Sequence, residues 1–349
     1  MFLALDFAVI IEKLVLIMIV VMGSLVVAMY MTYGERKVAG LLQDRPGPNR
    51  AGPFGLLQPL ADGMKLFFKE EIIPNFSSKA LFVLGPALAM LTAIMTSAII
   101  PWGDKVHFFD RDISLQIADI NIGVLYVFAV VSMGVYGIMI GSWASNNKYS
   151  LMGGLRAASQ IISYELAMGI SLIGLLMFTG TLSLKEMVVQ QQVGNWNIIY
   201  QPLGFLIFFI CAFAECNRTP FDLAEAESEL IGGYHTEYSS MKLGFYLFAE
   251  YINMFISSAV MASLYFGGYD MPFFNEAANA DMGNWLALIG IAAFMTKIII
   301  FIFIFMWVRW TVPRFRYDQL MHLGWRILIP LALFNMLATG AGILYFGNH

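Results

Sequence analysis

Long apolar stretches dominate this chain and predict its secondary structure. Uncharged runs such as residues 80–100 and 122–144 exceed the roughly 20 residues with which a helix crosses a bilayer. Each run is continuously apolar instead of alternating, which favours helices over barrel strands. Eight spans are predicted, at residues 14–33, 80–100, 122–144, 157–181, 198–214, 243–269, 285–308 and 327–347. The expected fold is all-α: one polytopic membrane domain over residues 1–349, with interfacial amphipathic helices beside the eight long transmembrane helices.

Lysine and arginine are distributed unevenly between the connections, and this predicts the orientation. The odd-numbered connections hold 15 of the 20 basic residues, whereas the even-numbered connections hold 3. Because basic residues concentrate on the cytoplasmic side, the odd connections are expected there, with both termini on the outer face. Asp6 and Glu12 precede the first apolar run and no basic segment does. We therefore expect this run to remain a transmembrane helix and not to act as a signal peptide.

The first connection is predicted to hold a stiff turn followed by a helix at the membrane surface. Three prolines and three glycines in residues 44–55 prevent a regular helix there. Beyond them, Leu57, Leu60, Met64 and Phe67 recur at helical spacing, with Asp62 on the other side. This pattern is typical of an amphipathic helix lying at the cytoplasmic interface.

The composition agrees with a membrane protein and excludes several kinds of cofactor site. Charged residues make up 13% of the chain, against about 25% in an average soluble protein. Two cysteines and four histidines are too few for a disulfide scaffold, a thiolate-ligated iron–sulfur cluster or a four-cysteine zinc site. The sequence contains no phosphate-binding loop and no HExxH helix. We therefore expect this chain to bind no metal and no cofactor of its own.

Three ionisable side chains fall inside the predicted spans, where a charge is costly and usually faces a bundle interior or a wet cavity. Glu165 and Glu250 each lie about 12 Å from the cytoplasmic end of their segments, at 1.5 Å per residue. Lys297 falls near the middle of the seventh segment. Such groups can exchange protons near neutral pH. The alternative is that they form structural ion pairs that hold helices together.

The fifth connection is unusually acidic for a cytoplasmic loop. Six acidic residues face only two bases, Arg218 and Lys242; the acids are Glu215, Asp222, Glu225, Glu227, Glu229 and Glu237. If residues 222–230 are helical, Asp222, Glu225 and Glu229 share one face and titrate as coupled groups. A charge run is usually a solvated face. Here apolar residues such as Phe221 are interleaved with the acids, which indicates poor solvation.

Four stretches together resemble one known family. They read GERKVAGLLQDRPGPNRAGPFGLLQPLADGMKLFFKEE (residues 34–71), SNNKYSLMGGLRAASQIISYELAMG (145–169), AECNRTPFDLAEAESELIGGYHTEYSSMKLG (214–244) and PRFRYDQLMHLGW (313–325). They are similar to the signature loops of the H subunit of proton-pumping NADH:quinone oxidoreductase, respiratory complex I. The resemblance extends over all eight predicted spans.

The resemblance implies a subunit that is not catalytic alone, forms much of the quinone chamber and couples quinone reduction to proton translocation. The residues it places in the chamber are Glu35, Arg36, Arg45, Asp62, Lys65, Arg218, Phe221 and Glu225. Those it places on an acidic proton path are Tyr164, Glu165, Glu215, Asp222, Glu227, Glu229 and Glu250, which Lys297 could continue. An apolar passage ending in polar groups suits a quinone, with its apolar tail and two-carbonyl head.

The resemblance also implies the surroundings of the chain. Quinone, ubiquinone or menaquinone, is the substrate, while FMN and iron–sulfur clusters are expected in partner subunits. The expected partners are peripheral-arm iron–sulfur and quinone-site subunits, small membrane subunits, antiporter-like subunits and membrane lipid, with no nucleic acid. The expected location is the bacterial cytoplasmic (inner) membrane.

Three other interpretations remain open on the sequence. A related membrane subunit of an energy-converting hydrogenase would lack the quinone-type loops at residues 34–71 and 313–325. A standalone proton or cation transporter predicts inverted repeats and broken helices, and neither pattern is visible in the sequence. A purely structural anchor leaves Glu165, Glu250 and Lys297 unexplained.

Overall fold

Long apolar helices form most of this computed structural model, which describes residues 7–108, 111–271 and 284–346. In lipid, a helix satisfies its own backbone hydrogen bonds, and this is why apolar runs of this length become helices. Seven helical segments of the described chain are long and apolar enough to cross a membrane. They are α1 (Phe7–Leu42), α3 (Lys79–Thr96, extended by the 3-10 turn Ser97–Ile99), α4 (Gly123–Ala144), α5 (Lys148–Thr179), α10 (Ser240–Tyr265), α11 (Asn284–Thr311), and α12 (Tyr317–His322) continued through a π turn (Leu323–Leu328) into α13 (Ile329–Phe346). The predicted all-α polytopic fold is therefore confirmed.

Shorter elements occupy the connections. Besides a 3-10 turn at Pro53–Gly55, they are α2 (Gln58–Phe68), α6 (Leu184–Val193), α7 (Asn197–Tyr200), α9 (Glu227–Leu230) and the 3-10 turn Gly233–His235. A small antiparallel hairpin, which the sequence pattern did not predict, pairs β1 (Lys105–Phe108) with β2 (Arg111–Ser114), in the register Lys105↔Ser114 and Phe108↔Arg111. The amphipathic helix after the proline-rich turn is confirmed as α2, and its Leu60, Met64 and Phe67 side chains are exposed.

The fifth predicted span is shorter than the others. Residues 198–214 are divided between α7 and α8 (Pro202–Glu215), with Gln201 outside helical geometry between them. The break has a local cause, because a proline disfavours helical geometry in the residue that precedes it. At 1.5 Å per residue, the 14 residues of α8 extend about 21 Å, less than the roughly 30 Å of a hydrocarbon core. The count of eight full-length spans is therefore not matched by the seven long segments.

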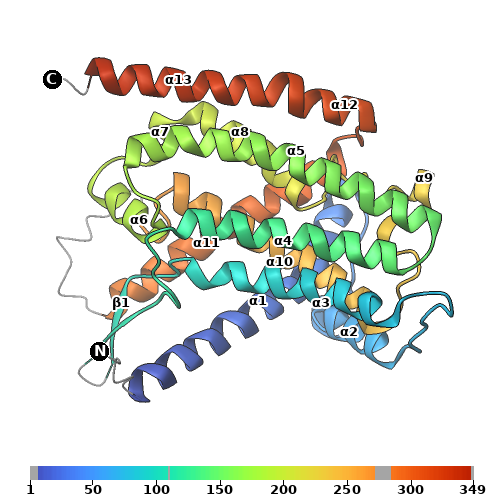
Figure 1. The fold of residues 1–349 in the computed structure, drawn as a ribbon. Coiled ribbons are helices and arrows are strands. Elements are labelled where there is room, and N and C mark those ends of the chain that lie inside the picture. The colour runs from blue at the N-terminus through green and yellow to red at the C-terminus, as the bar shows by residue number, and fades with distance from the viewer. Residues whose placement is uncertain (1–6, 109–110, 272–283, 347–349) are drawn as a thin grey trace.

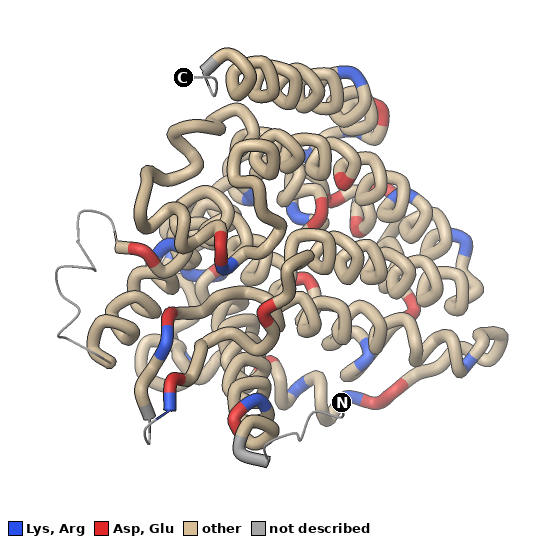
Figure 2. The backbone as a smooth tube through the Cα atoms, turned by 60° about the vertical axis from the view of Figure 1, so that its left-hand side comes forward, with Lys and Arg blue, Asp and Glu red and all other residues tan. Residues whose placement is uncertain are grey.

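The helices of the bundle lie side by side (Figure 1). The start of α1, the end of α13, β1 and α6 lie at one end of the bundle, and α2 and α9 lie at the other. The described ends of the chain are thus on the same side of the bundle. Figure 2 shows that the long helices are mostly tan and that charged residues interrupt them at few positions.

Helix α10 lies at the centre of the packing. In its most apolar stretch, 72% of the residues are buried, against 17% in α12–α13 at the edge of the bundle. Small residues allow α3 and α4 to approach closely, since a Cβ on Gly85 would stand 2.7 Å from the Gly141 Cα. Side chains that α10 presents to its neighbours therefore lie in the interior of the protein.

The acidic connection does not form the helix that we considered for residues 222–230. Only Glu227–Leu230 is helical, and residues 222–226 are irregular. Asp222, Glu225 and Glu229 thus do not share a helix face. The irregular backbone instead places Asp222 in the interior, where it is buried, and Glu229 at the surface, where it is exposed.

Candidate functional site

Arg218 lies at the centre of a buried ionic cluster. Its side chain is 6% exposed, with Nη1 3.4 Å from Glu35 Oε2 and Nη2 3.7 Å from Glu250 Oε2. Its guanidinium also stacks 4.2 Å from the centroid of the Tyr251 ring. Burial opposes the charge of Arg218, but Tyr251, Glu35 and Glu250 together hold its pKa above the usual range. Arg218 therefore stays charged and links a carboxylate of α1 to a carboxylate of α10.

Each carboxylate of this cluster has further partners. Glu35 pairs with Arg309 of α11 and accepts a hydrogen bond of 2.7 Å from the Tyr251 hydroxyl. Glu250 accepts a 2.9 Å hydrogen bond from the Tyr234 hydroxyl. A buried ion costs several kcal/mol unless partners of this kind compensate it. Three helices and the fifth connection thus meet at one set of buried charges.

The acids of the fifth connection continue the cluster. Asp222 accepts a 2.8 Å hydrogen bond from Arg314 Nη2, and Glu225 Oε1 lies 3.3 Å from His235 Nδ1. Burial and the nearby charge of Glu225 raise the pKa of Asp222 to about 7, although Arg314 opposes this. Burial acts to raise the pKa of Glu225 as well, but His235 lowers it below its usual value. Asp222 and Glu225 therefore differ in their affinity for a proton near neutral pH.

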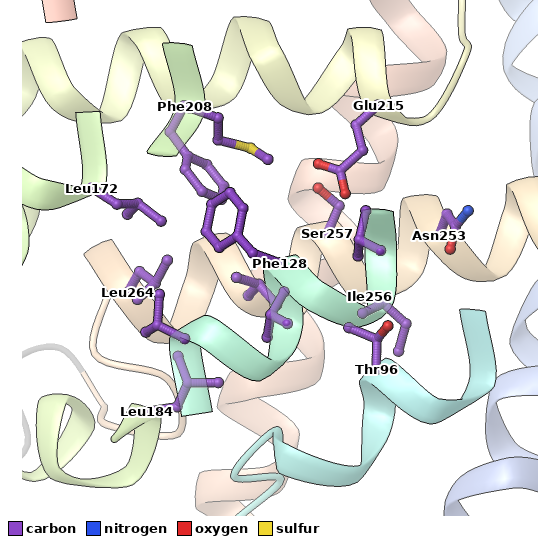
Figure 3. A pocket seen from close by; sticks show the side chains of 15 residues that line it. Thr96, Phe128, Leu172, Leu184, Phe208, Glu215, Asn253, Ile256, Ser257 and Leu264 are labelled. Carbon is purple, nitrogen blue, oxygen red and sulfur yellow. The ribbon is translucent and has the colours of Figure 1, made fainter. Parts of the chain in front are cut away.

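Two further carboxylates, Glu165 on α5 and Glu215 at the end of α8, are partly buried. Glu165 accepts a short hydrogen bond from the Ser132 hydroxyl, and its charge acts on Glu215 at the end of α8. Glu215 lines a cavity of about 30 Å³ that is mostly apolar, with Phe128 and Phe208 among its lining residues. Figure 3 shows the Glu215 carboxylate directed toward the Ser257 side chain, at the polar end of this cavity. A partly buried carboxylate facing a cavity is placed to exchange protons.

A second cavity connects Glu215 with the ionic cluster. It has a volume of about 40 Å³, and Glu215, Tyr234 and Glu250 all line it. Two carboxylates from different helices therefore face one internal space. Because Glu250 also contacts Arg218, the space reaches the buried charges described above.

The remaining predicted chamber residues fall into two groups. Arg36 and Asp62 form an ion pair of 2.7 Å that joins α1 to α2, while Arg45 and Lys65 are exposed. Phe221 is buried and packs edge-on against the ring of Tyr164, 5.2 Å away. Phe221 is thus part of the core beside the cluster, and the other four residues occupy the surface formed by α1, the proline-rich turn and α2.

Two of the remaining predicted path residues, Tyr164 and Glu229, have partners outside the Arg218 cluster. The Tyr164 hydroxyl donates a 2.9 Å hydrogen bond to the Leu320 carbonyl. Glu229 is exposed at the surface and pairs with Arg156 at 2.6 Å. The Glu227 side chain lies outside the described residues.

Lys297 is attached to the end of α10. Its ammonium donates hydrogen bonds of 2.7, 2.9 and 2.6 Å to the carbonyls of Phe266, Gly268 and Asp270, and lies 4.7 Å from the centroid of the Trp196 ring. Phe266 follows Glu250 by sixteen residues, which corresponds to about 24 Å along the helix axis at 1.5 Å per residue. Lys297 therefore compensates carbonyls left unpaired where α10 ends.

The structure adds partners that the sequence analysis did not name. Tyr234, His235, Tyr251, Arg309 and Arg314 all contact predicted site carboxylates. Arg309 and Arg314 were visible as bases near the end of the seventh span, but their pairing depends on long-range folding.

Among the described residues, no group of three or more His, Cys, Asp or Glu side chains could hold a metal ion. The arrangement can hold and exchange protons, and its buried cations can orient a polar head group.

Comparison with known proteins gives one consistent result. A family described as NADH dehydrogenase matches residues 14–340 of the chain. The chain is 67% identical over 335 residues to the H 1 subunit of the NADH-quinone oxidoreductase of Cytophaga hutchinsonii, covering 96% of this chain and 97% of that protein. It is 67% identical to the H subunit of Flavobacterium psychrophilum (98% and 99% covered) and 48% identical to the H 1 subunit of Geobacter metallireducens (97% of each). This chain therefore belongs to the NADH dehydrogenase family, among the H subunits of NADH-quinone oxidoreductase.

Proposed function

We propose that this chain is the membrane subunit that joins quinone reduction to proton translocation in an NADH-quinone oxidoreductase. The observation that carries the proposal is the set of buried and partly buried carboxylates on α1, α8, α10 and the fifth connection, joined by ion pairs and by one cavity. Ionisable groups inside a membrane-spanning bundle cost free energy, and they usually serve a function there. The chain acts as part of a larger assembly and supplies no redox centre of its own.

The proposed quinone chamber lies between the α1–α2 surface and the Arg218 cluster. Arg36 and Asp62, with Arg45 and Lys65 nearby, would form its outer polar part. Glu35, Arg218, Phe221 and Glu225 would form its inner wall. Quinone reduction needs two electrons and two protons; the electrons come from partner subunits, where we expect the FMN and iron–sulfur clusters. Proton uptake at the quinone changes the charge that the nearby carboxylates experience.

The proposed proton path begins in the fifth connection. Asp222 and Glu225 would adjoin the chamber, and Glu250 follows at the Arg218 cluster. Glu215 follows across the second cavity, which it lines together with Glu250, and Glu165 would come after Glu215. Tyr164, Glu227 and Glu229 remain path residues on the sequence prediction alone. Lys297 is proposed instead as a helix-end anchor, because three backbone carbonyls hold it.

The location and partners follow from the same proposal. The chain would lie in the bacterial cytoplasmic membrane with α2 and α9 toward the cytoplasm and both termini outside, as the basic residues of the odd connections favour. Peripheral-arm subunits with iron–sulfur clusters would cover the α2 end. Small membrane subunits and antiporter-like subunits would contact the lipid-exposed sides of the bundle.

The test replaces the titratable protons of the path without changing side-chain size. Glu165→Gln and Glu215→Gln are expected to assemble normally and to lower NADH:quinone turnover and proton pumping together, with little change in quinone KM. Glu186→Gln, on the exposed outer connection, is the matched control and should behave like the parent. Subunit content, KM and pumping are measured in the same membranes.

Other results would favour other functions. If the two glutamates only hold helices together, their replacement should lower subunit content, since a hydrogen bond to a charged group, such as the one from Ser132 to Glu165, contributes about 1.5–3 kcal/mol. Normal pumping at normal turnover in both variants would contradict the proton path. Copurification with hydrogenase subunits would favour the energy-converting hydrogenase, and ion transport by the purified single chain would favour a standalone transporter.

A further inference from the structure

The two internal cavities share one polar residue besides Glu215. Glu215 and Asn253 line both cavities, together with the apolar Val131. The side chain of Asn253 thus stands where the mostly apolar cavity meets the cavity that contains Glu250. Asn253 shares the second cavity with both Glu250 and Glu215, so a water held by its carboxamide would lie in the space that these two carboxylates face.

Asn253 also belongs to a polar stripe on a helix whose surroundings are apolar. Glu250, Asn253 and Ser257 are spaced i, i+3 and i+7 on α10, so they lie along one face. Figure 3 shows Asn253 and Ser257 along this helix, with the Glu215 carboxylate directed at Ser257. Beyond Ser257, the same cavity is lined by apolar residues such as Val260 and Leu264. The polar stripe therefore ends at the level of Glu215.

The Asn253 carboxamide is available for bonding with water. In the described part of the chain, no protein group is hydrogen-bonded to it. An amide carries two N–H donors and one carbonyl acceptor, so it can orient a water that donates to it and another that accepts from it. The second cavity has room for water and offers carboxylate, phenol and amide groups as partners.

We propose that Asn253 is a positioning residue for proton transfer: its carboxamide holds the water that links Glu250 to Glu215. This inference rests on the proton path proposed above and names the link in it. In the step, a protonated carboxyl group gives its proton to the bound water, and that water passes a different proton to the opposite carboxylate. One O–H bond breaks and one forms at each transfer, and the water and the amide are unchanged afterwards.

Two variants of Asn253 separate this role from a structural one. Asn253→Leu keeps the approximate size but cannot bind water, whereas Asn253→Asp keeps polar oxygen atoms in the same place. In whole complex in native membranes, Asn253→Leu should lower turnover and pumping about tenfold, the effect of about 1.4 kcal/mol on a barrier. Its solvent isotope effect in D2O should rise while quinone KM and subunit content stay at parental values. Asn253→Asp should restore most of the turnover.

The control is Ser258→Ala, because Ser258 donates to the Met254 carbonyl of its own helix and lines neither cavity. Parental turnover in Asn253→Leu would overturn the inference. Equal loss of subunits in the Leu and Asp variants would also overturn it, since that indicates a packing role. Glu215→Gln in the same membranes distinguishes failure of the proposed proton path from failure of the role of Asn253. If Glu215→Gln is defective while Asn253→Leu has parental turnover, only the inference about Asn253 fails. If Glu215→Gln pumps normally, the proposed path fails and the inference fails with it.

Discussion

Removing Arg218 should destabilise the complex chiefly through the carboxylates that it leaves behind. Its guanidinium lies 3.4 Å from Glu35 and 3.7 Å from Glu250, and all three side chains are almost fully buried. Glu35 keeps Arg309 and the Tyr251 hydroxyl in an Arg218→Met variant. Glu250 keeps a hydrogen bond from a tyrosine but loses the cation facing it. The loss of stability in the Arg218→Met variant should therefore come mainly from the unpaired carboxylate of Glu250.

The size of the effect follows from the distance. At 3.7 Å and an effective dielectric constant near 20, two unit charges interact by about 4.5 kcal/mol. Breaking one side of a buried pair costs about 3–5 kcal/mol in proteins, which is the same range. Replacing both partners removes the charge together with its counter-charge. The double variant Arg218→Met/Glu250→Gln should thus recover roughly half or more of the stability lost in the single variant.

The assay is the thermal midpoint of dissociation of the purified complex, with subunit content of the membranes as a second measure. The order of stability is expected to be parent, then double variant, then Arg218→Met. Arg156→Met is the control, because it breaks the pair with Glu229, which is half exposed and should contribute about 0–1 kcal/mol. A double variant less stable than Arg218→Met alone would refute the reasoning, since removing the unpaired carboxylate would then bring no relief.

Three further predictions concern orientation, pH and the end of α10. A cysteine at exposed Arg50 should be labelled only from the cytoplasmic side and one at exposed Val193 only from outside; the reverse pattern would invert the orientation. Burial raises the pKa of Asp222 from 3.8 to about 7, so the folded protein binds more protons than the unfolded chain between these values. The stability that this proton binding contributes is lost as the pH rises from 4 to 7. Asp222→Asn removes the titrating group, so the thermal midpoint of the parent should fall relative to that of the variant between pH 4 and 7. Lys297→Met should lower subunit content without raising the solvent isotope effect, because it frees three carbonyls; normal assembly with failed pumping would return Lys297 to the proton path.

The features that sequence predicted well are those set by local physics. The spans follow from the cost of exposing polar groups to lipid, and α2 follows from its helical spacing. The fifth span was too long in the prediction because hydropathy does not register the break that Pro202 imposes on Gln201. Helix α1 continues past the apolar run, so Glu35 and Arg36 lie on a helix rather than in a loop.

The pairings of the site could not be predicted, because they join residues far apart in the chain. Arg218 reaches Glu35, 183 positions away, and Arg314 reaches Asp222 across 92 positions. The acidic run indicated that charges cluster, but not which of them are buried. The two glutamates Glu225 and Glu229 are four residues apart, yet one contacts His235 inside the protein and the other lies at the surface. Only the path of the irregular backbone between them decides this.

The attachment of Lys297 gives α10 a fixed end. Lys297 binds three carbonyls just past the end of the helix, and Asn197 donates to the Leu264 carbonyl in its last turn. Glu250 lies toward the other end of the same helix. At that other end, Ser240 donates a hydrogen bond to the Leu66 carbonyl of α2. Because both ends of α10 are attached, a change of charge at Glu250 acts on a helix that cannot slide freely along its own axis. The effect of such a change then passes to both attachments, to Lys297 of α11 at one end and to α2 at the other.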